Sequence, residues 1–180
     1  MTDLSKLTPG TWTVDPSHST VGFVARHLMI TKVRGRFTDV AGRVTIAEDV
    51  ADSAVEVTIG TASVTSGADD RDGHLRSSDF FDVERHPTAT FASTAVRWDG
   101  RRASVAGDLT IVGVTRPVTL EVEYLGTVTD PTGRDRSIFS ASTEIDREDW
   151  GLTWNVALEA GGILVSKRIR IEIEVETVRE

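Results

Sequence analysis

The sequence predicts an all-β protein built from antiparallel strands. Apolar and polar residues alternate along most segments, most clearly over 167–176, where isoleucines and a valine take one face and charged residues the other. Turn signals separate the segments, among them Asp99-Gly100 and Asp130-Pro131-Thr132-Gly133. About eight strands of this kind need either a second sheet over their apolar faces or closure into a barrel.

The first half of the chain contains the earliest strands and one irregular stretch. We expect extended segments at 14–15, 20–29, 34–38, 43–47 and 54–61, with a bend near Gly42. Residues 66–82 lack strand character. Ser66 is placed to cap a short helix there, whose first turn is rich in aspartate. Leu75, Phe80 and Phe81 should turn inward and help this segment cap one end of the sheet.

The second half returns to strands. We expect a hairpin of 90–98 with 103–111, a turn over 113–117 leading into 118–124, a strand over 137–145, an irregular segment over 147–162 and a last strand over 167–176. Periodicity alone does not decide between a sandwich and a barrel. The inward set mixes large and small residues, however, and small residues facing one another leave space that a close-packed core would fill. This mixture favours a barrel that encloses a cavity.

Length and composition indicate one domain over residues 1–180, with 1–10 as a flexible N-terminal extension. The formal charge of −8, from 28 acidic and 20 basic residues, repels phosphate backbones and argues against a nucleic-acid partner. No apolar run approaches a membrane span and the first ten residues do not resemble a signal peptide. The expectation is a cytoplasmic protein without stable membrane insertion.

Motifs for catalysis are missing from the sequence. There is no cysteine, no G-x-S-x-G elbow, no H-E-x-x-H pair and no glycine-rich phosphate loop, so we predict no catalytic residue, no metal site and no cofactor. Small barrels do host isomerases and cyclases of hydrophobic substrates. An enzyme of that type is the alternative to a binding protein.

Four blocks of residues, taken in order along the chain, resemble the YceI-like family. They are Asp15-Pro16-Ser17-His18-Ser19 leading into Phe23 and His27, then 33–37, then 74–82, and then 107–117. The resemblance implies an extended eight-stranded antiparallel barrel, lipocalin-like, with short helices at its ends. It also implies an interior that holds a polyisoprenoid or isoprenoid-quinone chain as a hydrophobic small-molecule ligand, without catalysis, and commonly a homodimer.

The ligand-binding prediction follows the inward face of the strands. The expected apolar contacts are Val21, Phe23, Phe37, Val57, Phe91, Val105, Leu120, Phe139, Ile169 and Ile171. His27 shares this phase and is either a neutral core histidine or a contact for a ligand head group. Lys167 shares the phase of Ile169 and is either solvated or paired with a phosphate at the mouth. His18 is expected to be structural, bonded to backbone groups of its turn.

Overall fold

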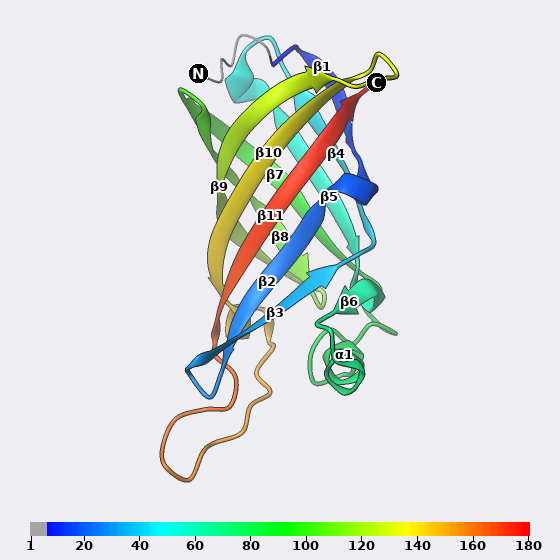
Figure 1. Cartoon of the computed structure of the whole chain (residues 1–180). Coiled ribbons are helices and arrows are strands. Elements are labelled where there is room, and N and C mark those ends of the chain that lie inside the picture. Colours follow the sequence, from blue (N-terminus) through cyan, green and yellow to red (C-terminus); the bar gives the residue numbers. More distant parts are fainter. Residues whose placement is uncertain (1–6) are drawn as a thin grey trace.

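The computed structural model describes residues 7–180, and strands dominate it (Figure 1). The strands are β1 (Gly10–Val14), β2 (Thr20–His27), β3 (Thr31–Phe37), β4 (Val40–Ile46), β5 (Ala54–Gly60), β6 (Val64–Thr65), β7 (Thr88–Asp99), β8 (Arg102–Ile111), β9 (Val114–Thr129), β10 (Asp135–Asp146) and β11 (Arg168–Arg179). One α-helix, α1 (Asp69–Arg76), and short 3-10 turns complete the described chain.

The sheet closes into a barrel between its first and last strands. Its order is β1-β4-β5-β7-β8-β9-β10-β11, and β1 also pairs with β11, for example Thr13 with Val178. Nearer its start, β11 pairs with β2, which pairs in turn with β3. β1 and β2 together therefore take one strand position of the barrel, and β3 and β4 together take the next. The predicted eight-stranded antiparallel barrel with short helices is confirmed.

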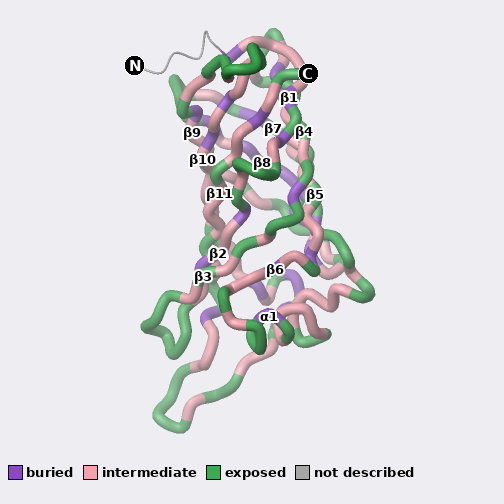
Figure 2. The backbone as a smooth tube through the Cα atoms, turned by 45° about the vertical axis from the view of Figure 1, so that its right-hand side comes forward, coloured by how far each residue is buried: buried purple, intermediate pink, exposed green. Residues whose placement is uncertain are grey.

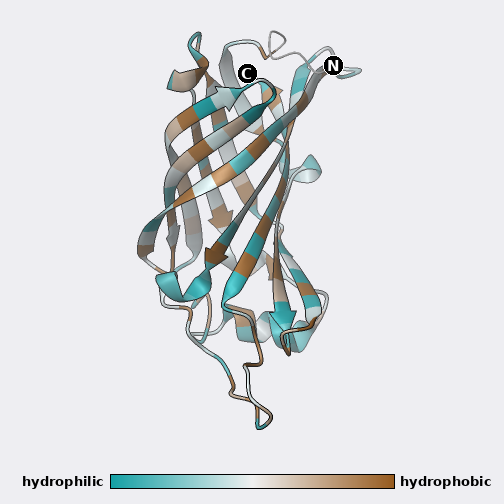
Figure 3. Cartoon of the chain, turned by 90° about the vertical axis from the view of Figure 1, so that its left-hand side faces the viewer, coloured by the Kyte–Doolittle hydropathy of each residue, from teal (hydrophilic) through white to brown (hydrophobic). Residues whose placement is uncertain are grey.

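Alternation along the strands explains this closure. On β11 the inward residues pair with inward residues of β10, Ile171 with Thr143 and Ile173 with Ala141, while Glu172 pairs with Ser142 on the outer face. Apolar and hydrophilic positions alternate in the same way along the other long strands (Figure 3). A closed sheet buries all the apolar faces together and leaves no long free edge.

The two ends of the barrel differ. Strand β1, the C-terminus and the turns β7–β8 and β9–β10 lie at one end, which we call the terminal end. The hairpin β2–β3, helix α1 and the segment 151–167 lie at the other, which we call the loop end (Figure 1). At the terminal end Leu7, Trp12, Ile46, Tyr124 and Phe139 form a buried cluster.

Several local predictions need correction. Helix α1 has Ala68, not Ser66, at its N-cap; Ser66 instead donates from its backbone N and its Oγ to the Asp72 carboxylate, at 2.7 and 2.6 Å. Strand β9 already begins at Val114, because the reversal takes only Val112 and Gly113, both at positive φ. The predicted turn over 113–117 is therefore mostly strand.

The predicted N-terminal extension is partly built into the fold. Leu7 is 7% exposed and packs in the terminal-end cluster, and Gly10 opens β1. Residues 1–6 of that prediction lie outside the described residues. Among the described residues, no helix has both the length and the hydropathy needed to cross a membrane.

Candidate ligand-binding lumen and its polar surroundings

Many inward-facing apolar side chains of the barrel are only half-buried. The alternation of the strands turns these side chains to the inner face of the sheet. Figure 2 shows how many positions along the strands are of this intermediate burial. From the half-buried inward residues we define the lumen wall as the following twelve, all on long strands: Phe23, Ala25, Val55, Val57, Ile59, Val118, Leu120, Val122, Ala141, Ile169, Ile171 and Ile173. A close-packed interior would bury these residues fully. The barrel is therefore hollow along this wall.

Two phenylalanines keep their rings against the wall. A Cβ added to Gly35 would collide with the Phe23 ring, and one added to Gly107 would collide with the Phe91 ring. Each ring thus lies over a glycine on a neighbouring strand instead of projecting to the barrel axis. Glycine at these two positions leaves room for the aromatic ring and preserves the width of the lumen.

The lumen is closed at the terminal end. Trp12 and Tyr124 are both 0% exposed, and the Trp12 Nε1 donates to Thr8 O at 3.1 Å. The Tyr124 hydroxyl lies 2.6 Å from Thr127 Oγ1, which lies 2.7 Å from Ser137 Oγ. Every polar atom in this chain of contacts has a partner, whereas Nε1 of Trp98, which packs against the same cluster, is buried without one among the described residues.

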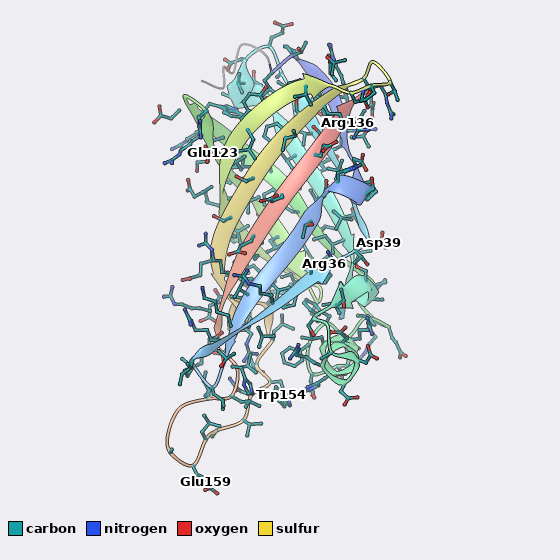
Figure 4. The ribbon with its side chains drawn as sticks, viewed as in Figure 1. Arg36, Asp39, Glu123, Arg136, Trp154 and Glu159 are labelled. Carbon is teal, nitrogen blue, oxygen red and sulfur yellow. The ribbon has the colours of Figure 1, made fainter. Side chains whose placement is uncertain are left out.

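Aromatic residues surround the loop end. Phe37 contacts both Phe23 and Phe81, with ring centroids 5.9 and 5.4 Å apart. His74 and Trp154 meet edge to face at 4.4 Å, linking α1 to the segment 151–167 (Figure 4). Trp150 and Leu152 belong to the main core cluster, the larger group of buried residues, which is completed by Ala89, Phe91, Val96, Ala103, Val105, Leu109 and Ile111. The loop end is therefore covered by side chains from three separate segments rather than by a continuous strand plug.

Arg147 is a buried cation at this end that the sequence analysis did not single out. It is 3% exposed, its Nε donates to Ser166 O at 3.0 Å and its Nη1 donates to Leu152 O at 2.5 Å. Its Nη2 is buried without a hydrogen-bond partner among the described residues, and its guanidinium lies 5.9 Å from the Phe80 ring centroid. Burial lowers the pKa of Arg147. The sequence Arg147-Glu148-Asp149-Trp150 is typical of an exposed turn, so it does not indicate that Arg147 is buried.

The structure divides the predicted contacts into three groups. Phe23, Phe37, Val57, Leu120, Ile169 and Ile171 are half-buried and inward; Val21, Phe91, Val105 and Phe139 are inward but fully packed; His27 and Lys167 are exposed at the loop end. Lys167 pairs with Glu148 at 3.0 Å. His27 ends β2 opposite Thr31 and also bridges to Val165. The two predicted polar contacts therefore lie outside the lumen wall.

A separate cluster of charges lies at the terminal end. Ligand atoms of Asp15, His18 and Glu176 come within 4.8 Å of one another, the spacing of a possible metal site. Arg136 already occupies the cluster, donating from Nη1 to Asp15 at 2.7 Å and to Glu176 at 2.6 Å, and from Nε to Asp130 at 2.8 Å (Figure 4). A bound guanidinium opposes a second cation, so we assign the cluster a structural role.

Two aspartates bonded to Arg136, Asp15 and Asp130, have lowered pKa values. Hydrogen bonds from Ser17 and Arg136 lower the pKa of Asp15, and hydrogen bonds from Thr132 and Arg136 lower the pKa of Asp130. The His18 Nδ1 lies 3.1 Å from the Asp15 carboxylate and 3.0 Å from the Ser17 hydroxyl. His18 thus bonds side chains of its turn, where backbone groups were expected.

A hollow of about 940 Å³ is lined by residues of both faces of the sheet. It is lined largely by outward polar residues of β2, β3, β9, β10 and β11, with arginines and glutamates in balance. Some of these charges pair with one another, as Arg34 does with Glu172 at 2.9 Å. Four residues of the lumen wall, Phe23, Val122, Ala141 and Ile173, also line this hollow, so polar and apolar side chains meet in it.

Comparison with known proteins agrees with this architecture. Residues 12–177 match the family model of the YceI-like domain. The chain belongs to the YceI-like family. It is 39% identical over 164 residues to Protein YceI of Escherichia coli O157:H7, a match that covers 91% of this chain and 83% of the relative.

Two solved structures share the YceI-like barrel. BcnA of Burkholderia cenocepacia superposes with a TM-score of 0.77 at 24% identity, covering 91% of this chain and 98% of that one. A polyisoprenoid binding domain from Saccharophagus degradans, implicated in plant cell wall breakdown, superposes with a TM-score of 0.73 at 15% identity, covering 96% and 100%. At these identities the two structures confirm the fold.

Proposed function

We propose that this YceI-like protein binds a long-chain isoprenoid lipid, a polyisoprenoid or an isoprenoid quinone, inside its barrel and does so without catalysis. The observation that carries the proposal is the lumen wall, which is apolar, inward and half-buried. Each buried CH₂ contributes roughly 0.8 kcal/mol of transfer free energy, so an apolar chain is the occupant this wall favours. The description of the Saccharophagus neighbour as polyisoprenoid-binding supports the same ligand class.

The chemistry of the wall favours binding over reaction. The twelve residues of the lumen wall are aliphatic or aromatic, which suits them to hold an apolar chain, whereas an isomerase or cyclase would need a general acid or base in addition. Incubation with prenyl alcohols followed by mass spectrometry tests this directly. Recovery of unchanged ligand fits a binding protein, and a rearranged product contradicts it.

We also propose a contact for the ligand head group. The Arg147 Nη2 lacks an acceptor, and an oxygen of a phosphate, hydroxyl or quinone head group would supply one. Hydrogen bonds to a charged group are worth about 1.5–3 kcal/mol, roughly ten- to a hundredfold in affinity. The structure favours Arg147 over His27 and Lys167, which are exposed, although head-group contacts from those two residues stay predictions.

The test of the ligand begins with protein purified without detergent. Native mass spectrometry should show a retained ligand, and lipid extraction should yield a prenyl chain. After delipidation, the protein should bind geranylgeraniol more tightly than a straight-chain alcohol of equal carbon number. The proposal is wrong if no prenyl chain is retained and none can be loaded.

The test of the head-group contact compares ligands that share one chain. Geranylgeranyl phosphate should bind roughly tenfold or more tightly than the matching hydrocarbon. In Arg147→Gln this preference should disappear while the hydrocarbon affinity is kept. Circular dichroism of the variant verifies that the fold is intact. An unchanged preference for the phosphate in Arg147→Gln would exclude this contact.

Two further sequence predictions stay predictions. Multi-angle light scattering of the purified protein measures whether it is a homodimer. Fractionation of the native cells measures whether it is cytoplasmic.

A further inference from the structure

The loop end exposes a compact group of large apolar side chains. Leu28, Met29 and Ile30, at the tip of the β2–β3 hairpin, are 45%, 50% and 78% exposed. Val156, on the segment 151–167, is 45% exposed. The two segments are connected through Leu164, whose O accepts from Leu28 N and whose N donates to Val156 O, both at 2.9 Å. We call Leu28–Ile30 and Val156 the lip; Figures 1 and 2 show both segments extending beyond the barrel.

The hairpin tip has a backbone that its residues do not favour. Leu28 and Met29 have φ of +51° and +62°, and Ile30 N donates to His27 O at 3.1 Å, so the pair forms a two-residue turn with both central residues in the left-handed region. Such turns prefer asparagine and glycine. Strained residues of this kind concentrate at functional sites. Neither the turn nor the barrel core requires leucine and methionine here.

The charge of the β2–β3 hairpin, which carries three of the four lip residues, is opposite to that of the whole chain, whereas the segment 151–167 adds the exposed Glu159 near Val156 (Figure 4). Residues 20–38 contain four cationic side chains and no acidic one, in a protein of net charge −8. Arg26 and Lys32 stand directly opposite each other at the base of the tip. Like charges in this position repel. Within residues 7–180 Lys32 has no ion-pair partner, so its charge is not neutralised by the protein.

We propose that the lip docks on an anionic lipid bilayer surface, with its apolar side chains in the interfacial region and Arg26 and Lys32 against lipid phosphates. An apolar tip flanked by basic residues is the pattern that binds such surfaces. The overall charge of −8 does not prevent this, because charges beyond about 8 Å are screened at physiological salt. Docking places the loop end of the barrel, rather than the plugged terminal end, at the membrane. The inference does not depend on which ligand fills the lumen.

Vesicle co-sedimentation tests the proposal. The delipidated protein should bind phosphatidylcholine vesicles that contain phosphatidylglycerol, bind pure phosphatidylcholine vesicles much less, and release at high salt. The double variant Met29→Asp/Ile30→Asp should lower the partition coefficient at least tenfold, and Lys32→Glu should lower it by about an order of magnitude. The matched control is Val128→Asp on β9, where Val128 is 54% exposed at the other end of the barrel. It should bind as the parent does.

A second variant separates docking from folding. Leu28→Asn/Met29→Gly places the favoured residues in the turn, so its thermal midpoint should rise while its vesicle binding falls. The proposal is overturned if the parent binds no anionic vesicle, if either tip variant binds as the parent does, or if Val128→Asp loses as much binding. The vesicles contain no prenyl lipid, so their binding does not depend on a ligand in the lumen. The docking proposal can therefore fail without affecting the proposed function, and the reverse also holds.

Discussion

Replacement of Ala141 by phenylalanine tests whether the barrel is hollow where its wall is half-buried. Ala141 and Ala103 lie on one inward ring, because both pair with Val122 of β9. Ala103 is 4% exposed and belongs to the main core cluster, whereas Ala141 is half-buried on the lumen wall. The same substitution, alanine to phenylalanine, can therefore be made in a packed core at residue 103 and beside the lumen at residue 141.

The expected magnitudes differ between the two sites. At Ala103 the new ring overfills a packed core and should lower the free energy of unfolding by about 1–3 kcal/mol. At Ala141 the ring enters the lumen, so the free energy of unfolding should change by less than about 1 kcal/mol. The ring there displaces about one isoprene unit of ligand. At about 0.3 kcal/mol per heavy atom, this lowers prenyl-chain affinity roughly tenfold.

Urea unfolding monitored by circular dichroism measures the stability of both variants. Displacement of a fluorescent prenyl analogue from delipidated protein measures the affinity of Ala141→Phe. The reasoning is refuted if Ala141→Phe is destabilised as much as Ala103→Phe, because the ring at residue 141 would then also meet packed side chains. It is equally refuted if Ala141→Phe is stable and binds the chain as the parent does.

Three further changes have defined outcomes. Gly35→Ala should displace the Phe23 ring and cost about 1–3 kcal/mol of stability in urea, and adding Phe23→Leu should recover part of it. Trp150→Phe should cost about 1 kcal/mol, since it removes the 3.0 Å hydrogen bond from Nε1 to Leu109 O; no loss in thermal or urea unfolding would contradict this. Acidification should destabilise the protein as the pH falls below about 4. The aspartates bonded to Arg136 have lowered pKa values in the folded state. Their contribution to stability is therefore complete only above the pKa of an aspartate in the unfolded chain, and it is lost as the pH falls below that pKa. Arg136→Gln should show a shallower loss over the same pH range, and equal slopes would exclude this cluster as the cause.

The sequence was informative about features that depend on alternation alone. Strand β11 was predicted within a few residues, since isoleucine at every second position allows one buried face. The same phase placed Ile169 and Ile171 on the inward side correctly. These features follow from the period of the strand, and no long-range contact is needed to find them.

Features that depend on contacts across the barrel were out of reach. How far the lumen wall is buried depends on which strands place large side chains opposite it. Phe23 lies over Gly35 only because the register of β2 and β3 pairs these two residues. Arg147 is buried, with its guanidinium bonded to the carbonyls of Ser166 and Leu152, although its own neighbours in sequence are acidic. The left-handed turn at Leu28 and Met29 contradicts local preference, so no turn signal could mark it.

The seam between β1 and β11 has a consequence for how the molecule forms. The strands that close the barrel lie at 10–14 and 168–179, so the last hydrogen-bonded pairing joins segments separated by most of the chain. Closure of so long a loop is entropically costly, and folds dominated by such pairings form slowly. During synthesis the seam is incomplete until β11 has left the ribosome. If the proposed lipid binds inside the barrel, its entry need not be through either end, because it can precede the pairing of β1 with β11.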